Sequence, residues 1–473
     1  MPRRPLRTVL TVLAVFLLLI PLVLCIFGFL LPAQYTQTFL GELPHKTELL
    51  RTAQKPRIIL VGGSSVPFSV KSELIQAAFE GYTVVDFGLY ADIGTPVMLD
   101  LLEEELRPGD IVIISPEQNS QALSTYFSPE SLWQAIDGSF DLLEQLSSHR
   151  YEKTAAAFPV FAGKKCYYAL FGNPLPQDIY ARSSFNAYGD IESPLRSANI
   201  MAGGFDPNQP ISFAPEVISG DFVTLLNDFA AHCRQIGADV YYRFPPMNAA
   251  AVTSDTGSPD DYYDHLNSRL DFPIMGDPNR SIMASGWFYD TNFHLNDSGA
   301  TVFTKYLIED LKILFLDTSP TDIPLPAMPA PTPIRPVPGD DSCAHCFTYR
   351  KTDNGWIVVG LTAEGNAAEV LIVPTTYDGQ PVVGIDQGVF QNNHRLKELV
   401  LQENIGLLYD GMFRGCTGLR RLVITGAPTT YTVGDGLMEG ANFLICVPAD
   451  QVDDFRRHYS WQRYSSYITP ASE

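Results

Sequence analysis

The sequence predicts an α/β protein: a doubly wound parallel sheet, preceded by a transmembrane helix and followed by a repeat module. Between residues 56 and 318, short apolar runs alternate with segments of helical periodicity. Residues 8–31 are uncharged, and two segments near the C-terminus repeat every 23 residues. The predicted divisions are 1–31 (cytoplasmic stub and transmembrane anchor), 32–55 (juxtamembrane segment), 56–318 (α/β domain), 319–341 (proline-rich linker) and 342–473 (repeat domain).

The composition argues against some classes of function. The chain has 473 residues and a formal net charge of −21. Nucleic-acid phosphates require clustered Lys and Arg, so we expect no nucleic-acid partner. The seven cysteines are spread thinly, which argues against a disulfide scaffold. We also expect no cofactor and no metal site.

The N-terminal segment predicts a membrane anchor. Thr8–Leu31 carries no charge and follows Arg3, Arg4 and Arg7. A helix of about 20 apolar residues spans a bilayer core, and flanking basic residues stay in the cytoplasm. We therefore expect a single-pass protein of the cell membrane with the bulk of the chain extracytoplasmic. A cleaved signal peptide is the alternative, although its apolar region is shorter, about 7–15 residues.

The predicted α/β domain begins with a buried strand over Arg57–Val61, which stops at two glycines and two serines. Strands and helices alternate after it, which is typical of a parallel sheet covered on both faces. Residues 150–215 show no clear period and are interpreted as an insertion. The other predicted strands are 83–87, 111–114, 238–244 and 272–275, and the helices are 72–79, 95–106, 128–146, 216–236 and one from Asn296 or Asp297 to about Phe315.

Two segments at opposite ends of this domain carry chemistry. Ser64 follows the first strand, at the edge where open α/β sheets place their active sites. A serine hydroxyl needs a base in contact, and the base needs a carboxylate partner. His294 stands just before the last predicted helix, with Asp290 four residues earlier. We expect these residues to meet above the sheet.

These segments resemble the SGNH/GDSL-type hydrolases, which have a flavodoxin-like fold, over about residues 56–316. Gly62–Ser64 is similar to the family's G-D-S block, with Gly63 in place of the usual Asp. His294 is similar to the late D-x-x-H block, and Asp290 lies one residue further away than usual. The resemblance implies that Ser64, His294 and Asp290 are catalytic.

The resemblance also implies an oxyanion hole, built from the nucleophile's N–H, a Gly after the second strand and an Asn after the third. Gly88 fits the glycine. Glu117 stands at the expected place of the asparagine, and Asn119 lies two residues further. A carboxylate opposes an oxyanion unless it is protonated or orients another group. Gly63 and Asn248 complete the predicted oxyanion and substrate-binding residues.

The predicted anchor and the resemblance together imply a membrane-anchored, extracytoplasmic esterase or acyltransferase. Its substrates would be acyl esters of cell-envelope carbohydrate, cleaved through an acyl-serine intermediate. Water and a sugar hydroxyl both stay open as acceptors. The alternative is a non-catalytic surface adhesin on a degenerate hydrolase scaffold, which Glu117 and the long Asp290–His294 spacing favour.

A proline-rich stretch, Ser319–Pro338, predicts an extended spacer after this domain. Cys343 and Cys346 follow it, with His345 between them. A closed zinc site needs four ligands. A local disulfide or two free thiols is therefore expected here.

Residues 382–401 and 405–424 match each other at a spacing of 23 residues, within the range of leucine-rich repeats. A weaker third copy places Ile445 in phase. The pattern resembles the BspA-type leucine-rich repeats of bacterial surface proteins over about residues 345–450. The tail, 452–468, is expected to cap the open end. The resemblance implies a binding face for a glycan or a protein, and a purely stabilising role stays open.

Overall fold

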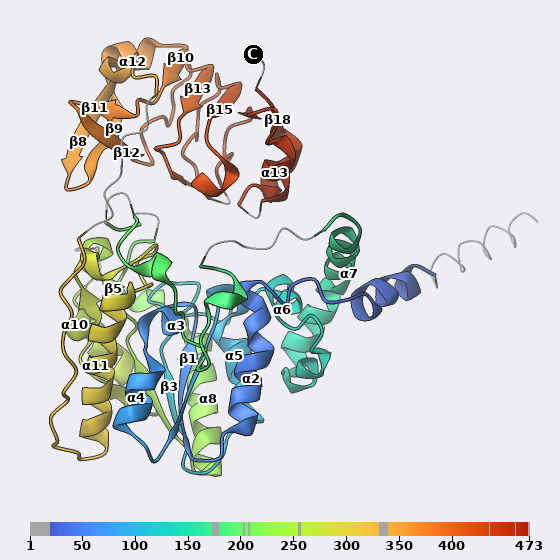
Figure 1. Cartoon of the computed structure of the whole chain (residues 1–473), viewed down its shortest axis with the longest axis vertical. Coiled ribbons are helices and arrows are strands. Elements are labelled where there is room, and N and C mark those ends of the chain that lie inside the picture. The colour runs from blue at the N-terminus through green and yellow to red at the C-terminus, as the bar shows by residue number, and fades with distance from the viewer. Residues whose placement is uncertain are drawn as a thin grey trace, which may run out of the picture. The chain divides into compact units, whose positions relative to one another are not determined.

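Two compact units make up the computed structural model, which describes residues 19–172, 179–201, 204–206, 209–253, 257–330, 339–434, 436–458 and 460–471 (Figure 1). The first unit comprises residues 1–199 and 209–330. The second comprises residues 200–208 and 331–473. Parallel sheets are found in both.

The N-terminal segment corrects the predicted fold class and localisation. Residues 8–18 of the predicted anchor lie outside the described residues. From Leu19 onward, no described helix is both long and apolar enough to cross a bilayer. The helical segment there ends in the π-helix η1 (Ile26–Leu30), whose Phe29 stacks on Phe158 at 4.7 Å between ring centroids. The predicted transmembrane helix and single-pass localisation are therefore wrong, and the fold is mixed α/β with several parallel sheets.

A parallel sheet of order β2-β1-β3-β4-β6 forms the centre of the first unit. Strand β1 is buried along its whole length, as expected for a strand covered on both faces. The strands are β1 (Arg57–Gly62), β2 (Thr83–Gly88), β3 (Ile111–Ile114), β4 (Asp239–Arg243) and β6 (Ile274–Met275). The carboxyl ends of β1, β2 and β3 thus share one edge of the sheet.

Helices cover both faces of this sheet (Figure 1). On one face, Ile58 and Leu60 of β1 pack with Val66, Ile75 and Leu307 from helices α3, α4 and α11. On the other face, helices α2, α5 and α8 contact β2, β1 and β4. These helices are α2 (Leu43–Thr52), α3 (Ser65–Ser69), α4 (Ser72–Ala78), α5 (Thr95–Glu103), α8 (Gly220–Ile236) and α11 (Asp297–Leu314).

The segment after β3 differs from the prediction. The helix expected over 128–146 is split into α6 (Pro129–Ala135) and the 3-10 helix η4 (Phe140–Gln145), because Gly138 at φ 97° turns the backbone between them. Helix α7 (Ser148–Phe171) occupies the start of the predicted insertion. Its few buried residues are Thr154, Phe161, Ala162 and Lys165. So sparse a buried face leaves little periodic signal in the sequence.

Shorter elements complete the first unit and surround the edge of the sheet. A two-stranded sheet, β5 with β7, lies beside helices α9 and α10. Their bounds, with those of the 3-10 helices, are η2 (Phe39–Glu42), η3 (Ala91–Ile93), η5 (Arg182–Ser184), η6 (Pro194–Arg196), η7 (Pro215–Val217), β5 (Met247–Asn248), η8 (Ala249–Ala251), α9 (Pro259–Asn267), α10 (Pro278–Ser281), β7 (Ile282–Met283) and η9 (Ser285–Trp287).

The second unit is built on a parallel sheet of order β10-β13-β15-β17-β18. A second sheet, β11-β12-β9-β8, is formed by strands that come before and after β10 in the chain. The elements are η10 (Ala344–Cys346), β8 (Phe347–Thr352), β9 (Gly355–Leu361), α12 (Ala363–Ala367), β10 (Val370–Ile372), β11 (Thr376–Tyr377), β12 (Gln380–Ile385), β13 (Glu398–Leu401), β14 (Leu407–Leu408), β15 (Arg421–Ile424), η11 (Pro428–Thr430), β16 (Thr432–Val433), β17 (Leu444–Val447), α13 (Val452–Arg457), η12 (Gln462–Tyr467) and β18 (Ile468–Pro470).

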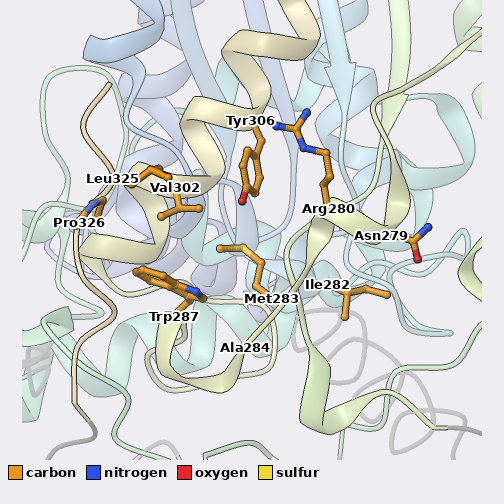
Figure 2. Close-up of a pocket in the computed structure, with 10 residues that line it drawn as sticks. All are labelled: Asn279, Arg280, Ile282, Met283, Ala284, Trp287, Val302, Tyr306, Leu325 and Pro326. Carbon is orange, nitrogen blue, oxygen red and sulfur yellow. The ribbon is translucent and has the colours of Figure 1, made fainter. Parts of the chain in front are cut away.

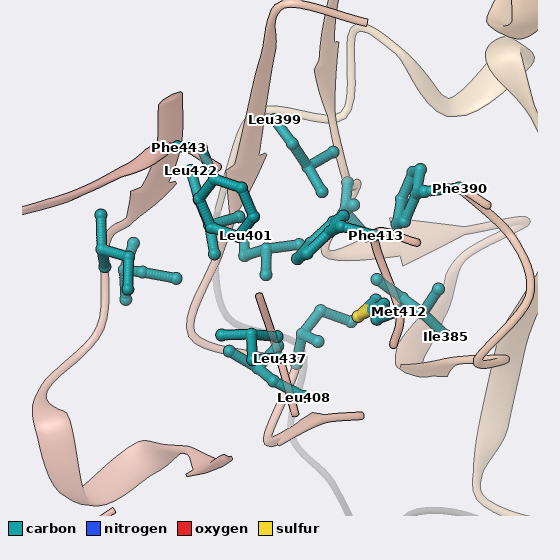
Figure 3. Close-up of a cluster of buried hydrophobic side chains, with 14 of the residues drawn as sticks. Ile385, Phe390, Leu399, Leu401, Leu408, Met412, Phe413, Leu422, Leu437 and Phe443 are labelled. Carbon is teal, nitrogen blue, oxygen red and sulfur yellow. The ribbon is translucent and has the colours of Figure 1, made fainter. Parts of the chain in front are cut away.

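The 23-residue period becomes a column of buried residues in this unit. Leu399, Leu422, Ile445 and Ile468 stand in register on successive strands. Leucines and phenylalanines from the intervening loops fill the core beside them (Figure 3). The tail does more than the expected capping, because β18 adds a strand with Ile468 in the same phase.

Candidate active site

Ser64 lies between the end of β1 and the start of α3. Gly62, two residues before Ser64, packs against the residue that follows β3. A Cβ at position 62 would lie 2.4 Å from the carbonyl oxygen of Ser115, so only glycine fits there. Ser64 has a helical backbone, with φ −65° and ψ −21°, and only 4% of its surface is exposed. The close packing of the two strand ends therefore fixes the position of this hydroxyl.

His294 and Asp290 come from the loop between η9 and α11. His294 Nε2 lies 2.8 Å from Ser64 Oγ, and His294 Nδ1 lies 2.8 Å from Asp290 Oδ1. Because a carboxylate only accepts hydrogen bonds, we assign the ring proton to Nδ1, which leaves Nε2 to accept the serine proton. The structure thus brings together three predicted residues (the triad), although Ser64 and His294 are 230 residues apart.

A narrow loop places Asp290 within reach despite its longer spacing. The Oγ1 of Thr291 accepts hydrogen bonds from the N–H groups of Phe293 and His294, at 3.2 and 3.0 Å. The N–H of Tyr289 donates to the carbonyl of His294 at 2.8 Å, which closes the loop. Three residues, instead of two, therefore separate Asp290 from His294 without moving the carboxylate away from the ring.

Two further side chains hold the triad, and sequence reasoning missed both. The hydroxyl of Tyr180 lies 2.5 Å from Asp290 Oδ2 and 3.5 Å from His294 Nδ1. The ring of Phe68 stacks on His294 with centroids 4.0 Å apart and planes 5° apart. Phe68 follows Ser64 by four residues, about one helical turn, and this spacing could have placed the two side chains on the same face of the helix. Tyr180 belongs to the region without periodicity, so its sequence offers none.

Glu117 is the predicted residue that differs most from an oxyanion donor. Its Oε1 lies 3.2 Å from Ser64 Oγ and accepts a hydrogen bond from the Ser65 N–H at 3.2 Å. Burial raises the pKa of the Glu117 carboxyl, while His294 and the close contacts with the Ser65 N–H and the Ser64 hydroxyl act in the opposite direction. A buried carboxyl group therefore stands directly beside the nucleophile.

The other predicted binding residues make their hydrogen bonds elsewhere. The N–H of Gly88 donates to Asp86 Oδ1 at 2.8 Å. The side-chain oxygen of Asn119 accepts the N–H groups of residues 121 and 122, at 3.1 and 2.9 Å. The side-chain oxygen of Asn248 accepts from the N–H of residue 250 and the hydroxyl of residue 285, at 3.1 and 2.9 Å. The Gly88 N–H and the side-chain oxygens of Asn119 and Asn248 are thus engaged by groups other than Ser64.

Both carboxyl groups of the site, those of Asp290 and Glu117, make hydrogen bonds with neighbouring protein groups. Asp290 is held by His294 and Tyr180, and Glu117 by the Ser65 N–H. In the part of the chain that the structure describes, no group of three or more His, Cys, Asp or Glu side chains is arranged to hold a metal ion. The site is thus organised by hydrogen bonds among its own side chains.

A cavity of about 330 Å³ lies between η9 and α11, the elements that flank the loop with Asp290 and His294 (Figure 2). Trp287, Tyr306 and Met283 point into it, and the segment after α11 closes one side with Leu325. The full lining is Asn279, Arg280, Ile282, Met283, Ala284, Trp287, Val302, Tyr306, Leu325 and Pro326. No triad residue lines this cavity, so the chemistry of Ser64 does not take place in it.

The solved structures that match this chain include two weak structural neighbours. The crystal structure of a T. pallidum leucine-rich repeat protein matches at 19% identity and a TM-score of 0.17, over 23% of this chain and 53% of that one. Protein YxiM from Bacillus subtilis matches at 13% identity and a TM-score of 0.26, over 55% of this chain and 58% of that one. The chain thus spans just over half the length of each. No family model and no curated protein matches, and at these TM-scores neither neighbour identifies a family.

Proposed function

We propose that the first unit is a serine esterase or acyltransferase of the SGNH type, acting through an acyl-serine intermediate. The observation that carries the proposal is the hydrogen-bonded triad, with 2.8 Å from Ser64 Oγ to His294 Nε2 and 2.8 Å from His294 Nδ1 to Asp290. A serine becomes a nucleophile when a base takes its proton. The base is efficient when a carboxylate orients it and stabilises its charged form.

The first half of the reaction forms the acyl-serine. Ser64 Oγ attacks the carbonyl carbon of the ester, its proton moves to His294 Nε2, and the carbonyl electron pair moves onto the oxygen. The oxyanion then collapses, the bond to the alcohol breaks, and His294 gives its proton to the leaving oxygen. Asp290 stays ionised and stabilises the imidazolium throughout.

The second half regenerates Ser64. A hydroxyl compound attacks the acyl-serine, its proton passes to His294, and Ser64 recovers that proton as the acyl bond breaks. Water as the acceptor gives an esterase, and a sugar hydroxyl gives an acyltransferase. Acylated carbohydrate is the substrate class that the sequence resemblance implies, and we include it in the proposal.

The test measures hydrolysis of a short-chain acyl ester and labelling by a fluorophosphonate with the full-length protein. We expect wild type to react in both assays, and Ser64→Ala and His294→Ala to lose about 10⁶ in kcat. Ser69→Ala is the matched control, since this buried serine ends the short helix α3 that follows Ser64, with its hydroxyl 3.4 Å from the Phe293 carbonyl. Equal inertness of wild type and Ser64→Ala would overturn the proposal.

One observation favours a second candidate, a non-catalytic binding protein. Glu117 is in contact with Ser64, and an ionised carboxylate there would oppose an oxyanion. In that case wild type would not be labelled, while the full-length chain would still be retained on immobilised polysaccharide. In either case we propose that the repeat unit supplies a binding face for a glycan or a protein.

A further inference from the structure

The hydroxyl of Ser64 has one proton and two close partners. Because Asp290 fixes the ring proton on Nδ1 of His294, the serine proton is donated to Nε2. Glu117 Oε1 is nevertheless only 3.2 Å from the same serine oxygen. Two acceptor oxygens repel each other at this distance unless a proton lies between them, and the remaining source of that proton is Glu117.

We propose that Glu117 works as a neutral carboxylic acid, whose O–H donates to Ser64 Oγ at rest and to the oxyanion during acyl transfer. This inference rests on the proposed function and adds a catalytic residue to it. The proton of Glu117 stays on Glu117 in every step, because the proton that moves is that of Ser64. A neutral carboxylic acid can donate a hydrogen bond to the oxyanion, whereas an ionised carboxylate has no proton to donate.

The surroundings of Glu117 favour its neutral form. The group is 7% exposed, and burial raises the pKa of its carboxyl. Two titratable groups act on its charge: Asp92, from η3, raises the pKa, and His294, from the loop before α11, lowers it. The described groups that act most on its charge include no lysine or arginine. A buried carboxylate without a cation is costly, so the proton is retained.

Gly63 provides the space that this carboxyl occupies. A Cβ at position 63 would lie 3.0 Å from Glu117 Oε1 and 3.3 Å from Ala91. Gly63 is not among the glycines with positive φ, so space is the reason for glycine here, and backbone conformation is not. The carboxyl of Glu117 therefore occupies space that a side chain at position 63 would otherwise fill.

The kinetic test compares Glu117→Gln with Glu117→Ala in the full-length protein. Gln keeps the shape but cannot ionise. With its NH2 at the position of Oε1, it donates to Ser64 Oγ as the neutral acid does and gives up the acceptor for the Ser65 N–H. We expect Glu117→Ala to lose about 10²–10³ in kcat, as when one oxyanion donor is removed. Glu117→Gln should stay within about tenfold of wild type. Glu130→Gln, in a surface pair with Lys164, is the control.

The pH profile separates the neutral acid from a merely structural carboxyl. We expect the kcat of wild type to fall as the pH rises through the pKa of Glu117, because the ionised group opposes the oxyanion. Glu117→Gln should lack this alkaline fall. The inference is overturned if Glu117→Ala is as active as wild type, or if Glu117→Gln keeps the same alkaline fall.

Two readouts do not depend on activity. A carboxylic acid carbonyl band of Glu117 should appear at neutral pH in the difference between the infrared spectra of wild type and Glu117→Gln. The difference spectrum is needed because burial also raises the pKa of the Asp86 and Asp190 carboxyls. Since the folded pKa is raised, the stabilisation from this group is complete below the unfolded value of about 4.3 and is lost as the pH rises through the folded value. Glu117→Gln should remove that slope in the free energy of unfolding. Absence of the band would overturn the inference, whereas absence of fluorophosphonate labelling would overturn the proposed function.

Discussion

The two units bury different kinds of side chain. The first buries whole ion pairs around its sheet, whereas the described polar residues buried in the second are uncharged. The buried pairs are Lys46–Asp86, Arg57–Asp110, Lys165–Asp137 and Arg243–Asp310, and the uncharged residues are Thr375, Asn393 and Gln402. A repeat is stabilised by stacking one apolar pattern on itself. A site needs buried polar groups that hold each other in a unique arrangement.

This contrast predicts that substitutions in the triad cost activity and substitutions in the repeat cost stability. Among the substitutions that compare the two units, Asp290→Asn should have the largest effect, a loss of about 10⁴ in kcat, because the amide stabilises the wrong tautomer of His294. The melting temperature should change little. Ester hydrolysis and thermal unfolding measure the two quantities. Asp264→Asn, on the exposed side of α9, is the control, and a comparable loss there would contradict the assignment.

Leu422→Ala should show the opposite behaviour. Leu422 is fully buried in β15 between Leu399 and Ile445. Its truncation removes apolar contacts and leaves a cavity, which costs about 2–5 kcal/mol of unfolding free energy. Urea denaturation followed by tryptophan fluorescence measures this loss, while ester hydrolysis at low urea should be unchanged.

Val423→Ala sharpens the comparison within the same strand. Val423 is half-buried and points to the opposite face from Leu422. Its truncation should destabilise the chain less than that of Leu422. Equal effects of the two substitutions would contradict the assignment of the core face. A loss of ester hydrolysis in Leu422→Ala would break the separation between the units.

Tyr180→Phe should have the smallest effect. It removes a hydrogen bond to Asp290, worth about 1.4 kcal/mol or roughly tenfold in kcat, and should leave KM unchanged. Combined with Asp290→Asn, it should add little, since both act through the same carboxyl group. Tyr188→Phe, nearby in the sequence, serves as the control. An additive double variant would show that Tyr180 acts elsewhere.

Part of the site was predictable because its signals are local. Ser64 follows a buried strand at a glycine turn, and His294 stands four residues after Asp290 and shortly before a capped helix. The contact of Tyr180 with Asp290 and the burial that raises the pKa of Glu117 were not predictable, since they depend on which segments meet in space. The predicted transmembrane helix failed because apolar composition gives neither the length of the helix nor what its end packs against.

The sequence by itself determined the alternation of strands and helices, the 23-residue repeat, and the two segments that carry the triad. These features are written in neighbouring residues, as periodicity and turn chemistry. Only the tertiary structure decided that Ser64 and His294 touch, that Tyr180 holds Asp290, and that Gly63 leaves room for Glu117. Those facts depend on contacts between residues far apart in the chain, whose distances are set by packing.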